Sequence, residues 1–390
     1  MSLSAPILDE VAPEEEQPTA APAAAPLLLH VFPSFAVGGA QVRFAALANR
    51  FGARWRHVVV TLDGRSDCLK RIQAGASVTT IQPPWEVSPG PAQRLARIAA
   101  LLRRLNPALL VTSNWGSIEW AMANRLGPRL PHLHTEDGFG PEESGGQFRR
   151  RILFRRLVLR RSSVMLPSQT LLRAAQEVWR LPTQQLSHLP NGIDLRRFRP
   201  DGLKAQLGLG GEGPLIGTVA ALRPEKNLAR LLRAAALLRQ QGVAFRLVLI
   251  GDGPERPRLE ALAGELGIGG VTRFAGHVAD PAAAYRAMDI VALSSDTEQM
   301  PFSVLEAMAT GLPVAATEVG DVRLMLSEGN APFLAARSDA ALAEALRPLL
   351  LDATLRHRIG RANRFKAERD YDQENMFQAH ARLIEQTMRP

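Results

Sequence analysis

The sequence predicts an α/β protein built from two doubly wound, Rossmann-like domains. With 390 residues, of which 46% are hydrophobic, the chain is long enough to bury two separate cores. Short β-like runs alternate with helical patterns along the chain, which is typical of parallel strands joined by right-handed crossovers. Residues 289–317 are predicted to form a strand, a loop, a helix and a strand, a unit that binds ligands where the strand ends and the helix begins.

The first 25 residues differ from the rest of the chain. They hold five acidic residues, no basic residue and a Pro/Ala-rich end, without the basic start and apolar run of a signal peptide. We therefore expect residues 1–25 to be a disordered acidic tail on a cytoplasmic protein. The net charge of the whole chain is +9, so the part expected to fold is more basic still.

Cysteine, histidine and hydropathy exclude several classes of protein. Cys68 is the single cysteine, so the chain has no disulfide framework and suits a reducing compartment. The eight histidines lack a HExxH-like spacing, and we expect neither a metal nor a cofactor. No run of about 18 apolar residues occurs, so no membrane-spanning helix is expected.

Residues 26–195 are predicted to form the first domain. Strands are expected at 27–32, 57–62, 77–81, 108–112, 130–137, 163–167 and 186–189, and helices at 41–51, 92–105, 147–161 and 168–181. Gly38 and Gly39 form the turn after the first strand, where they allow a close approach of the backbone to a ligand. They do not form a G-x-G-x-x-G fingerprint, which disfavours a dinucleotide-dependent oxidoreductase.

The strand expected at 130–137 ends in polar residues. Regular alternation places His132, His134 and Glu136 on one face and Asp137 on the other. A lone histidine is usually a structural residue. At the carboxyl end of a strand in this fold, however, such positions line the cleft, so His134 is a candidate for catalysis.

Residues 147–161 hold seven arginines interleaved with apolar side chains. At helical spacing Ile152, Leu153, Val158 and Leu159 form a broad apolar face with guanidinium groups around it. One interpretation is a core-packing helix with a solvated basic rim. The other is an interfacial helix that binds an anionic membrane surface. Nucleic-acid binding is not expected, because no aromatic interleaving, zinc knuckle or recognition helix accompanies the arginines.

Residues 196–372 are predicted to form the second domain, after a hinge that begins at the turn Asn191–Gly192. Strands are expected at 214–220, 245–250, 271–276, 289–293 and 314–317, and helices after residue 226, at 302–310 and at 340–351. The last helix, within 373–390, is expected to pack back against the first domain.

Two cations of the second domain point to an anionic ligand. Arg223 and Lys226 stand three residues apart at a loop-to-helix junction, so both can reach one anion held by the helix start. Without such a ligand, two cations at a helix N-terminus would be unfavourable because of the helix dipole.

Two carboxylates flank a second helix start in this domain. Glu298 and Glu306 lie eight residues apart around it. Carboxylates beside an anion site need hydroxyls as partners, and a sugar and a ribose would supply them. The alternative is that both are ordinary acids, one solvated and one favoured by the helix dipole. The N–H groups expected to be free at this helix start belong to Phe302, Ser303 and Val304.

The stretch 294–317, SSDTEQMPFSVLEAMATGLPVAAT, is similar to the donor-binding element of retaining glycosyltransferases of family 4, which have the two-domain GT-B fold. The resemblance extends over residues 27–388 and includes the NGID segment at 191–194. Gln299 stands where many relatives have glycine. The resemblance implies a GT-B fold with a nucleotide-diphosphate sugar held mainly by the second domain.

The resemblance also implies roles for single residues. Arg223 and Lys226 would bind the donor diphosphate, Glu298 the sugar hydroxyls and Glu306 the ribose. Family members often read HTEHG near the transferred sugar where this chain reads HTEDG, so Asp137 stands in the place of a histidine. Other residues that would lie near the phosphates or the base are Gly39, Gly251, Gly253 and His277.

We therefore predict a retaining, metal-independent glycosyltransferase. Its acceptor would be a glycan or a lipid-linked glycan of envelope polysaccharide or glycolipid biosynthesis, reached from the cytoplasmic face of the inner membrane. Two alternatives remain open from the sequence. One is a GT-B sugar-nucleotide epimerase or hydrolase, and the other is a non-catalytic lipid- or nucleic-acid-binding protein.

Overall fold

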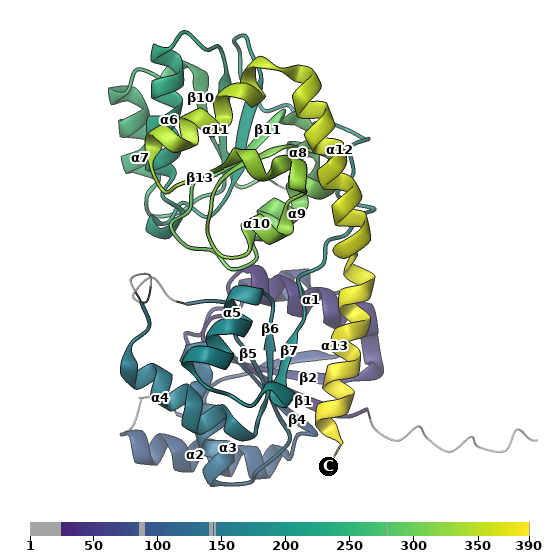
Figure 1. The fold of residues 1–390 in the computed structure, drawn as a ribbon. Coiled ribbons are helices and arrows are strands. Elements are labelled where there is room, and N and C mark those ends of the chain that lie inside the picture. Colours follow the sequence, from purple (N-terminus) through teal and green to yellow (C-terminus); the bar gives the residue numbers. More distant parts are fainter. Residues whose placement is uncertain (1–24, 86–89, 140–142, 144–145, 279, 390) are drawn as a thin grey trace, which may run out of the picture.

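The computed structural model describes residues 25–85, 90–139, 143, 146–278 and 280–389. The tail predicted for residues 1–25 lies outside this part, apart from Ala25. The described chain forms two α/β domains that lie one above the other, with helices α12 and α13 running along one side of both (Figure 1). The two-domain α/β architecture that the sequence predicts is confirmed.

The first domain contains a parallel sheet of seven strands in the described part, in the order β3-β2-β1-β4-β5-β6-β7. Its strands are β1 (Leu27–Phe32), β2 (Arg56–Thr61), β3 (Val78–Ile81), β4 (Leu109–Ser113), β5 (His132–Thr135), β6 (Ser163–Leu166) and β7 (Leu186–His188). Its helices are α1 (Gly39–Phe51), α2 (Pro91–Leu105), α3 (Ile118–Leu126), α4 (Arg149–Val158) and α5 (Gln169–Arg173).

The second domain contains a parallel sheet of six described strands in the order β10-β9-β8-β11-β12-β13. The strands are β8 (Leu215–Val219), β9 (Arg246–Ile250), β10 (Thr272–Gly276), β11 (Ile290–Leu293), β12 (Val314–Thr317) and β13 (Leu334–Ala335). The helices are α6 (Leu228–Gln240), α7 (Arg256–Glu265), α8 (Pro281–Ala287), α9 (Phe302–Ala309), α10 (Val322–Met325), α11 (Asp339–Leu351) and α12 (Ala353–Asp370).

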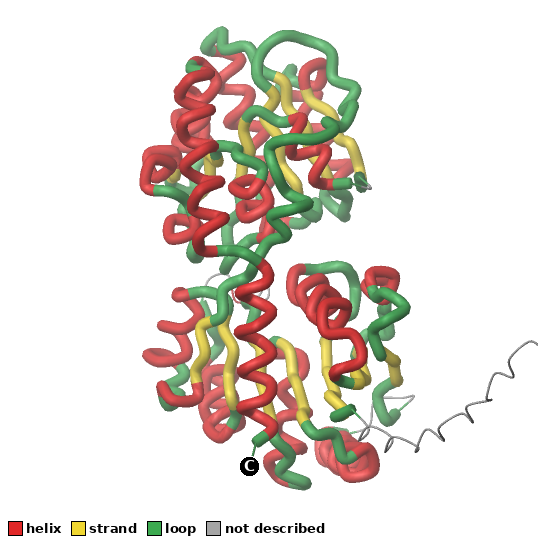
Figure 2. Tube along the Cα trace, turned by 90° about the vertical axis from the view of Figure 1, so that its right-hand side faces the viewer, coloured by secondary structure: helices red, strands yellow, loops and turns green. Residues whose placement is uncertain are grey.

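Both sheets are covered on their two faces, which explains the continuous apolar runs in the sequence. Strands β4 and β11 are buried along their whole length, as expected for parallel strands with helices on either side. In the second domain α6 and α11 pack on one face and α8 and α9 on the other, each over its own apolar core. The tube trace shows these layers in each domain (Figure 2).

The chain crosses between the domains twice at one place. Ile193 of the hinge pairs with Asp372, and a Cβ on Gly192 would lie only 2.6 Å from the Cα of Gln373. Helix α13 (Gln373–Met388) then packs against the first domain, where Leu383 and Ile384 join the core under β1 and β4. The crossing therefore holds two chain segments in contact at the hinge (Figure 1).

Two predicted helices differ from the structure. The helix expected at 168–181 is α5 followed by a π-helical turn, Ala174–Val178. In the arginine-rich helix α4, the core-packing interpretation would bury Leu153, which is 54% exposed, whereas Arg155 is completely buried. Val158 and Leu159, at the end of this segment, pack in the core as the core-packing interpretation requires, but that interpretation fails for Leu153, whose exposure agrees with the interfacial one. Within the described residues, no helix combines the length and apolarity needed to cross a membrane.

Candidate active site

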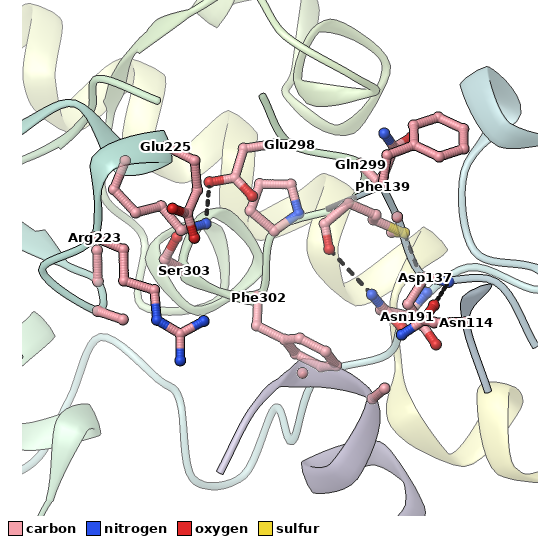
Figure 3. A pocket seen from close by; sticks show the side chains of 18 of the residues that line it. Asn114, Asp137, Phe139, Asn191, Arg223, Glu225, Glu298, Gln299, Phe302 and Ser303 are labelled. Atoms are coloured by element: carbon pink, nitrogen blue, oxygen red, sulfur yellow. Dashed lines mark hydrogen bonds and ion pairs between the residues drawn. The ribbon is translucent and has the colours of Figure 1, made fainter. Parts of the chain in front are cut away.

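A cavity of about 750 Å³ lies between the two domains, at the carboxyl ends of both sheets. Figure 3 shows that residues of both domains line it, with Arg223, Glu225 and Glu298 at one side and Asn114 and Asp137 at the other. The predicted site residues that line it are Gly39, Asp137, Arg223, Lys226, Glu298, Phe302, Ser303 and Glu306. The structure therefore brings most of the predicted site together.

The cationic pair lies in a short loop between β8 and α6. Arg223 begins a 3₁₀ turn that ends at Lys226, and Asn227 takes a left-handed conformation (φ 39°) and caps α6 through its side chain. The Arg223 side chain is exposed at the mouth of the cavity, whereas Lys226 is partly buried. Both cations are thus carried by a turn that α6 fixes at its N-terminus.

Glu298 is paired with Lys226 on the second-domain side of the cavity. The Lys226 ammonium donates to the Glu298 carboxylate at 2.6 Å, and the Ser295 hydroxyl donates to the same oxygen at 2.7 Å. The Glu298 side chain is only 10% exposed. A carboxylate held in this way has one oxygen engaged by the protein and the other left for a ligand hydroxyl.

The loops that carry Lys226 and Glu298 are tied together by Arg230. Its guanidinium donates to the Ser294 carbonyl at 2.7 Å and to Asp296 at 2.7 Å. Asn227 donates to the other Asp296 oxygen at 3.0 Å. The distance between the cation and the carboxylate is therefore set by packed elements rather than by surface loops.

Helix α9 begins at Phe302, as predicted, and its first turn faces the cavity. The prediction of three free N–H groups is wrong for Val304, whose N–H donates to the Pro301 carbonyl at 3.2 Å, and whose side chain is buried in the core. The tight turn at Pro301 causes this bond. The N–H groups of Phe302 and Ser303 remain at the helix start within the described chain, where the dipole favours an anion.

Glu306 lies in the second turn of α9 and borders the cavity. Burial raises the pKa of its carboxyl group to about 7, although a hydrogen bond from Tyr285 and the cations Arg197 and Arg71 act in the opposite direction. Glu306 also borders a second cavity, of about 650 Å³, beside the hinge. The Glu306 carboxyl group is therefore expected to gain or lose its proton near neutral pH.

On the first-domain side of the cavity, Asp137 is held by contacts with several elements. Its carboxylate binds the Arg43 guanidinium through two contacts, at 2.5 and 2.9 Å, and its N–H donates to the Asn114 side chain at 2.7 Å. Arg43 also donates to Asn191 of the hinge, which in turn donates to the Met300 carbonyl of the second domain. The position of Asp137 is thus fixed by α1, β4 and the hinge together.

The expectation that His134 lines the cleft is wrong. Its ring is completely buried and contacts the Thr112 hydroxyl at 2.8 Å and the Glu136 carboxylate at 3.4 Å. The strand keeps its regular alternation, so His132, His134 and Glu136 do share one face, but that face lies inside the domain. Asp137, just beyond the strand, is the residue of this segment that reaches the cavity.

Gly251, Gly253 and His277 do not line the main cavity. The two glycines are required by the backbone, because a Cβ on Gly251 would lie 1.9 Å from the Ala220 carbonyl oxygen and one on Gly253 2.4 Å from that of Leu222. They bring the loop after β9 close to the loop that holds Arg223. His277 is exposed at the end of β10.

Gly39 faces the other domain rather than open space. A Cβ at this position would lie 3.2 Å from the Phe302 ring, so the turn after β1 and the start of α9 are in close contact. Further contacts join the two sides of the cavity. Ser168 donates to Gln299, and the Asp321 carboxylate accepts from the N–H groups of Gln169 and Thr170. The domains are therefore held together around the site.

Several cavity residues were not singled out from the sequence: Gln41, Asn114, Trp115, Phe139, Arg151 and Glu225. Asn114 and Trp115 follow directly after β4, and the rule that strand ends line the cleft would have found them. Asn114 also has a positive φ of 58°, which is uncommon outside glycine and frequent at functional sites.

Among the described residues, no three His, Cys, Asp or Glu side chains cluster as they would to hold a metal ion.

Two family matches cover most of the chain. Residues 37–197 match the family described as Glycosyltransferase Family 4, and residues 201–366 match Glycosyl transferases group 1. The D-inositol 3-phosphate glycosyltransferase of Stackebrandtia nassauensis is 29% identical over 269 residues, which are 63% of this chain and 60% of that protein. The chain thus spans about three fifths of the length of this curated relative.

Solved structures share the fold over nearly the whole chain. Anabaena HepE in complex with UDP-glucose superposes with a TM-score of 0.77, at 20% identity, over 93% of this chain and all of that chain. WaaG, a glycosyltransferase involved in lipopolysaccharide biosynthesis, gives a TM-score of 0.72, at 20% identity, over 92% of this chain and 99% of that chain. These likenesses confirm the predicted GT-B arrangement.

Proposed function

Since the chain belongs to the glycosyltransferases, with a Family 4 domain followed by a group 1 domain, we propose that it transfers a sugar from a nucleotide-diphosphate sugar with retention. The observation that carries this proposal is the cavity in which Arg223 and Lys226, the start of α9, Glu298 and Glu306 all meet. Cations and helix amides suit a diphosphate, and the two carboxylates suit hydroxyls on either side of it. The complex of HepE with UDP-glucose supports a donor of this class.

The proposed reaction breaks the bond between the anomeric carbon and the β-phosphate oxygen. Negative charge grows on the leaving diphosphate, and Arg223, Lys226 and the amides of Phe302 and Ser303 stabilise it without a metal ion. The acceptor oxygen bonds to the anomeric carbon on the face that the diphosphate leaves. Its proton passes to the departing phosphate oxygen, and the configuration of the sugar is retained.

A screen of nucleotide sugars by thermal shift tests the donor. We expect UDP- or GDP-sugars to raise the melting temperature in a concentration-dependent way, because a ligand that binds the native state stabilises it. Product analysis with and without added glycoside then separates transfer from hydrolysis and epimerisation. If no sugar nucleotide changed the melting temperature or was consumed, the proposal would be refuted.

We further propose that helix α4 attaches the protein to an anionic membrane surface, which would give access to a lipid-linked acceptor. Large apolar side chains are exposed along one short stretch at Phe148, Leu153, Phe154 and Leu157, which are 41–55% exposed. Exposed arginines stand among them at positions 149, 150, 156, 160 and 161. Apolar groups that enter the interface and guanidinium groups that meet phosphates are the two elements of an interfacial helix.

Flotation with liposomes tests this attachment. The protein should float with vesicles that contain phosphatidylglycerol and much less with neutral phosphatidylcholine vesicles, since each arginine near an anionic surface contributes about 1 kcal/mol. Leu153→Ser with Leu157→Ser should weaken binding in low and high salt alike. Arg149→Gln with Arg150→Gln should weaken it chiefly in low salt. Equal recovery with both kinds of vesicle would contradict an electrostatic contribution.

A further inference from the structure

Arg155 is a fully buried cation in the middle of α4. Its Nε donates to the Glu136 carboxylate at 3.1 Å, and a second buried carboxylate, Glu143, lies 3.6 Å from its guanidinium. Each of these three side chains has no exposed surface. Arginine is rarely buried to this extent unless it is paired. A helix that only packs in the core does not need a buried cation, so Arg155 calls for a further explanation.

Three aromatic rings surround the same guanidinium. Its central carbon lies 5.1 Å from the centre of the Trp115 ring, 5.5 Å from that of Phe139 and 4.9 Å from that of Trp179. These distances are within the range of cation–π attraction. Trp115 and Phe139 come from different loops, after β4 and after β5, and Arg155 is the group that both of them contact.

Trp115 and Phe139 also line the cavity between the domains; we refer to these two residues as the aromatic wall. Helix α4 contacts the wall at two further points, since the Phe154 ring lies 6.2 Å from that of Trp115 and the Arg151 guanidinium lies 5.1 Å from it. Asp137 stands two residues before Phe139, directly after the buried Glu136. The wall therefore lies on the first-domain side of the cavity, opposite the residues assigned to the donor.

We propose that Arg155 is a positioning residue for the acceptor, holding Trp115 and Phe139 as a preformed wall on which the apolar face of an acceptor sugar ring packs. Aromatic rings offer a large, rigid apolar surface of this kind, and fixing them in advance removes an ordering cost from binding. The role of the wall rests on the proposed transferase function. That Arg155 holds Trp115 and Phe139 in place does not depend on that function.

The chain offers a matched pair of variants for the test. Arg155→Met removes the buried guanidinium, and Arg156→Met makes the same change at the next residue, which is exposed. Arg155→Lys keeps the charge without the planar group that contacts three rings. Fluorine NMR of protein labelled with fluorotryptophan reports on Trp115 directly, and Trp115→Phe assigns its resonance among the five tryptophans.

We expect Arg155→Met to shift or broaden the Trp115 resonance, Arg155→Lys to do so less, and Arg156→Met to leave it unchanged. The Trp55 resonance should stay constant in all three, because Trp55 packs in a different core. With UDP-glucose as donor and p-nitrophenyl glycosides as acceptors, both Arg155 variants should raise the acceptor KM about tenfold, while the Kd for UDP-glucose stays within about twofold of the wild-type value.

The possible failures can be told apart. An unchanged Trp115 resonance in folded Arg155→Met protein would overturn the inference, whatever the substrate. If Arg155→Met did not fold, an unchanged resonance in folded Arg155→Lys protein would overturn it. A disturbed wall with an unchanged acceptor KM would overturn its role in acceptor binding. A wild-type protein that binds no sugar nucleotide would instead refute the proposed function, and the NMR result would still decide whether Arg155 fixes the wall.

Discussion

Lys226→Ala is expected to lower the turnover number by roughly 10²- to 10³-fold, the loss typical of removing one group that stabilises a developing oxyanion. Lys226 reaches into the cavity and pairs with Glu298 at 2.6 Å. The positive charge of Lys226 would stabilise the negative charge that grows on the diphosphate as it leaves the sugar. Because that charge is greatest in the transition state, the turnover number should fall more than the donor affinity.

The fold should survive this substitution. The Lys226 side chain is 24% exposed, and an ion pair that solvent can reach contributes at most about 1 kcal/mol to stability. Lys204→Ala is a matched control, since Lys204 is exposed and lies outside the cavity lining. Steady-state transfer rates and melting temperatures of the two variants decide the matter. Near-normal turnover of Lys226→Ala would remove Lys226 from the mechanism.

Arg223→Ala extends the same expectation to the mouth of the cavity. Arg223 is exposed and would bind the proposed diphosphate directly, so its loss should weaken donor binding as well as turnover. Arg347→Ala, on the exposed face of α11, serves as its control. If the two arginine variants behaved alike, the diphosphate would have to bind elsewhere.

The sequence predicted the second-domain side of the cavity better than the first-domain side, although Gly251, Gly253 and His277 lie outside the cavity lining. Glu298, the start of α9 and Glu306 come from one continuous stretch, so their spacing along a loop and a helix already fixes their geometry. Arg223 and Lys226 likewise share one turn. For these residues the local sequence pattern is enough to predict that their side chains lie close together.

The first-domain side of the cavity depends on contacts between residues that are distant in the sequence. Trp115, Phe139 and Trp179 meet around Arg155, and none of these four residues indicates its partners by spacing. Helical periodicity assigned the arginines of α4 to the surface, since a buried charge is costly unless a partner compensates it. The compensating Glu136 lies 19 residues away on another element, which periodicity cannot detect.

Local regularity also led to errors at the ends of elements. The alternation of β5 holds through Glu136, yet the face that carries His134 is buried, because helix α4 packs over it and its Arg155 bonds to Glu136. The Val304 amide was expected to be free, but the turn at Pro301 satisfies it. In both cases the local pattern correctly predicted the strand alternation or the helix start. Contacts with neighbouring residues then decided whether the group was accessible.

Replacing Glu306 by Gln should make the protein more stable above neutral pH and less able to bind its donor there. In the folded state burial raises the pKa of Glu306 to about 7, against a usual value of 4.5. The unfolded chain therefore releases this proton at lower pH than the folded chain. Between these two pKa values the unfolded state binds fewer protons, so the free energy of unfolding falls as the pH rises.

The two pKa values set the expected size of this effect. Below about pH 4.5 the carboxyl group is protonated in both states and contributes no difference, and above about pH 7 the full loss is present. A shift of this size corresponds to about 3 kcal/mol, which partial exposure of the side chain reduces to about 1–3 kcal/mol. Glu306→Gln should remove that loss and raise the melting temperature at about pH 8 but not at about pH 5.

Donor binding should respond in the opposite direction. Ribose hydroxyls donate to a carboxylate most strongly when it is ionised, so the wild-type protein should bind its donor more tightly as the pH rises through 7. Glu306→Gln should lose this dependence and bind about 10- to 100-fold more weakly at about pH 8, as expected when charge-assisted hydrogen bonds are lost. Calorimetric titrations across this pH range test both changes. A variant that was no more stable at high pH would contradict the raised pKa of Glu306. A variant that bound the donor as well as the wild-type protein would place the ribose away from Glu306.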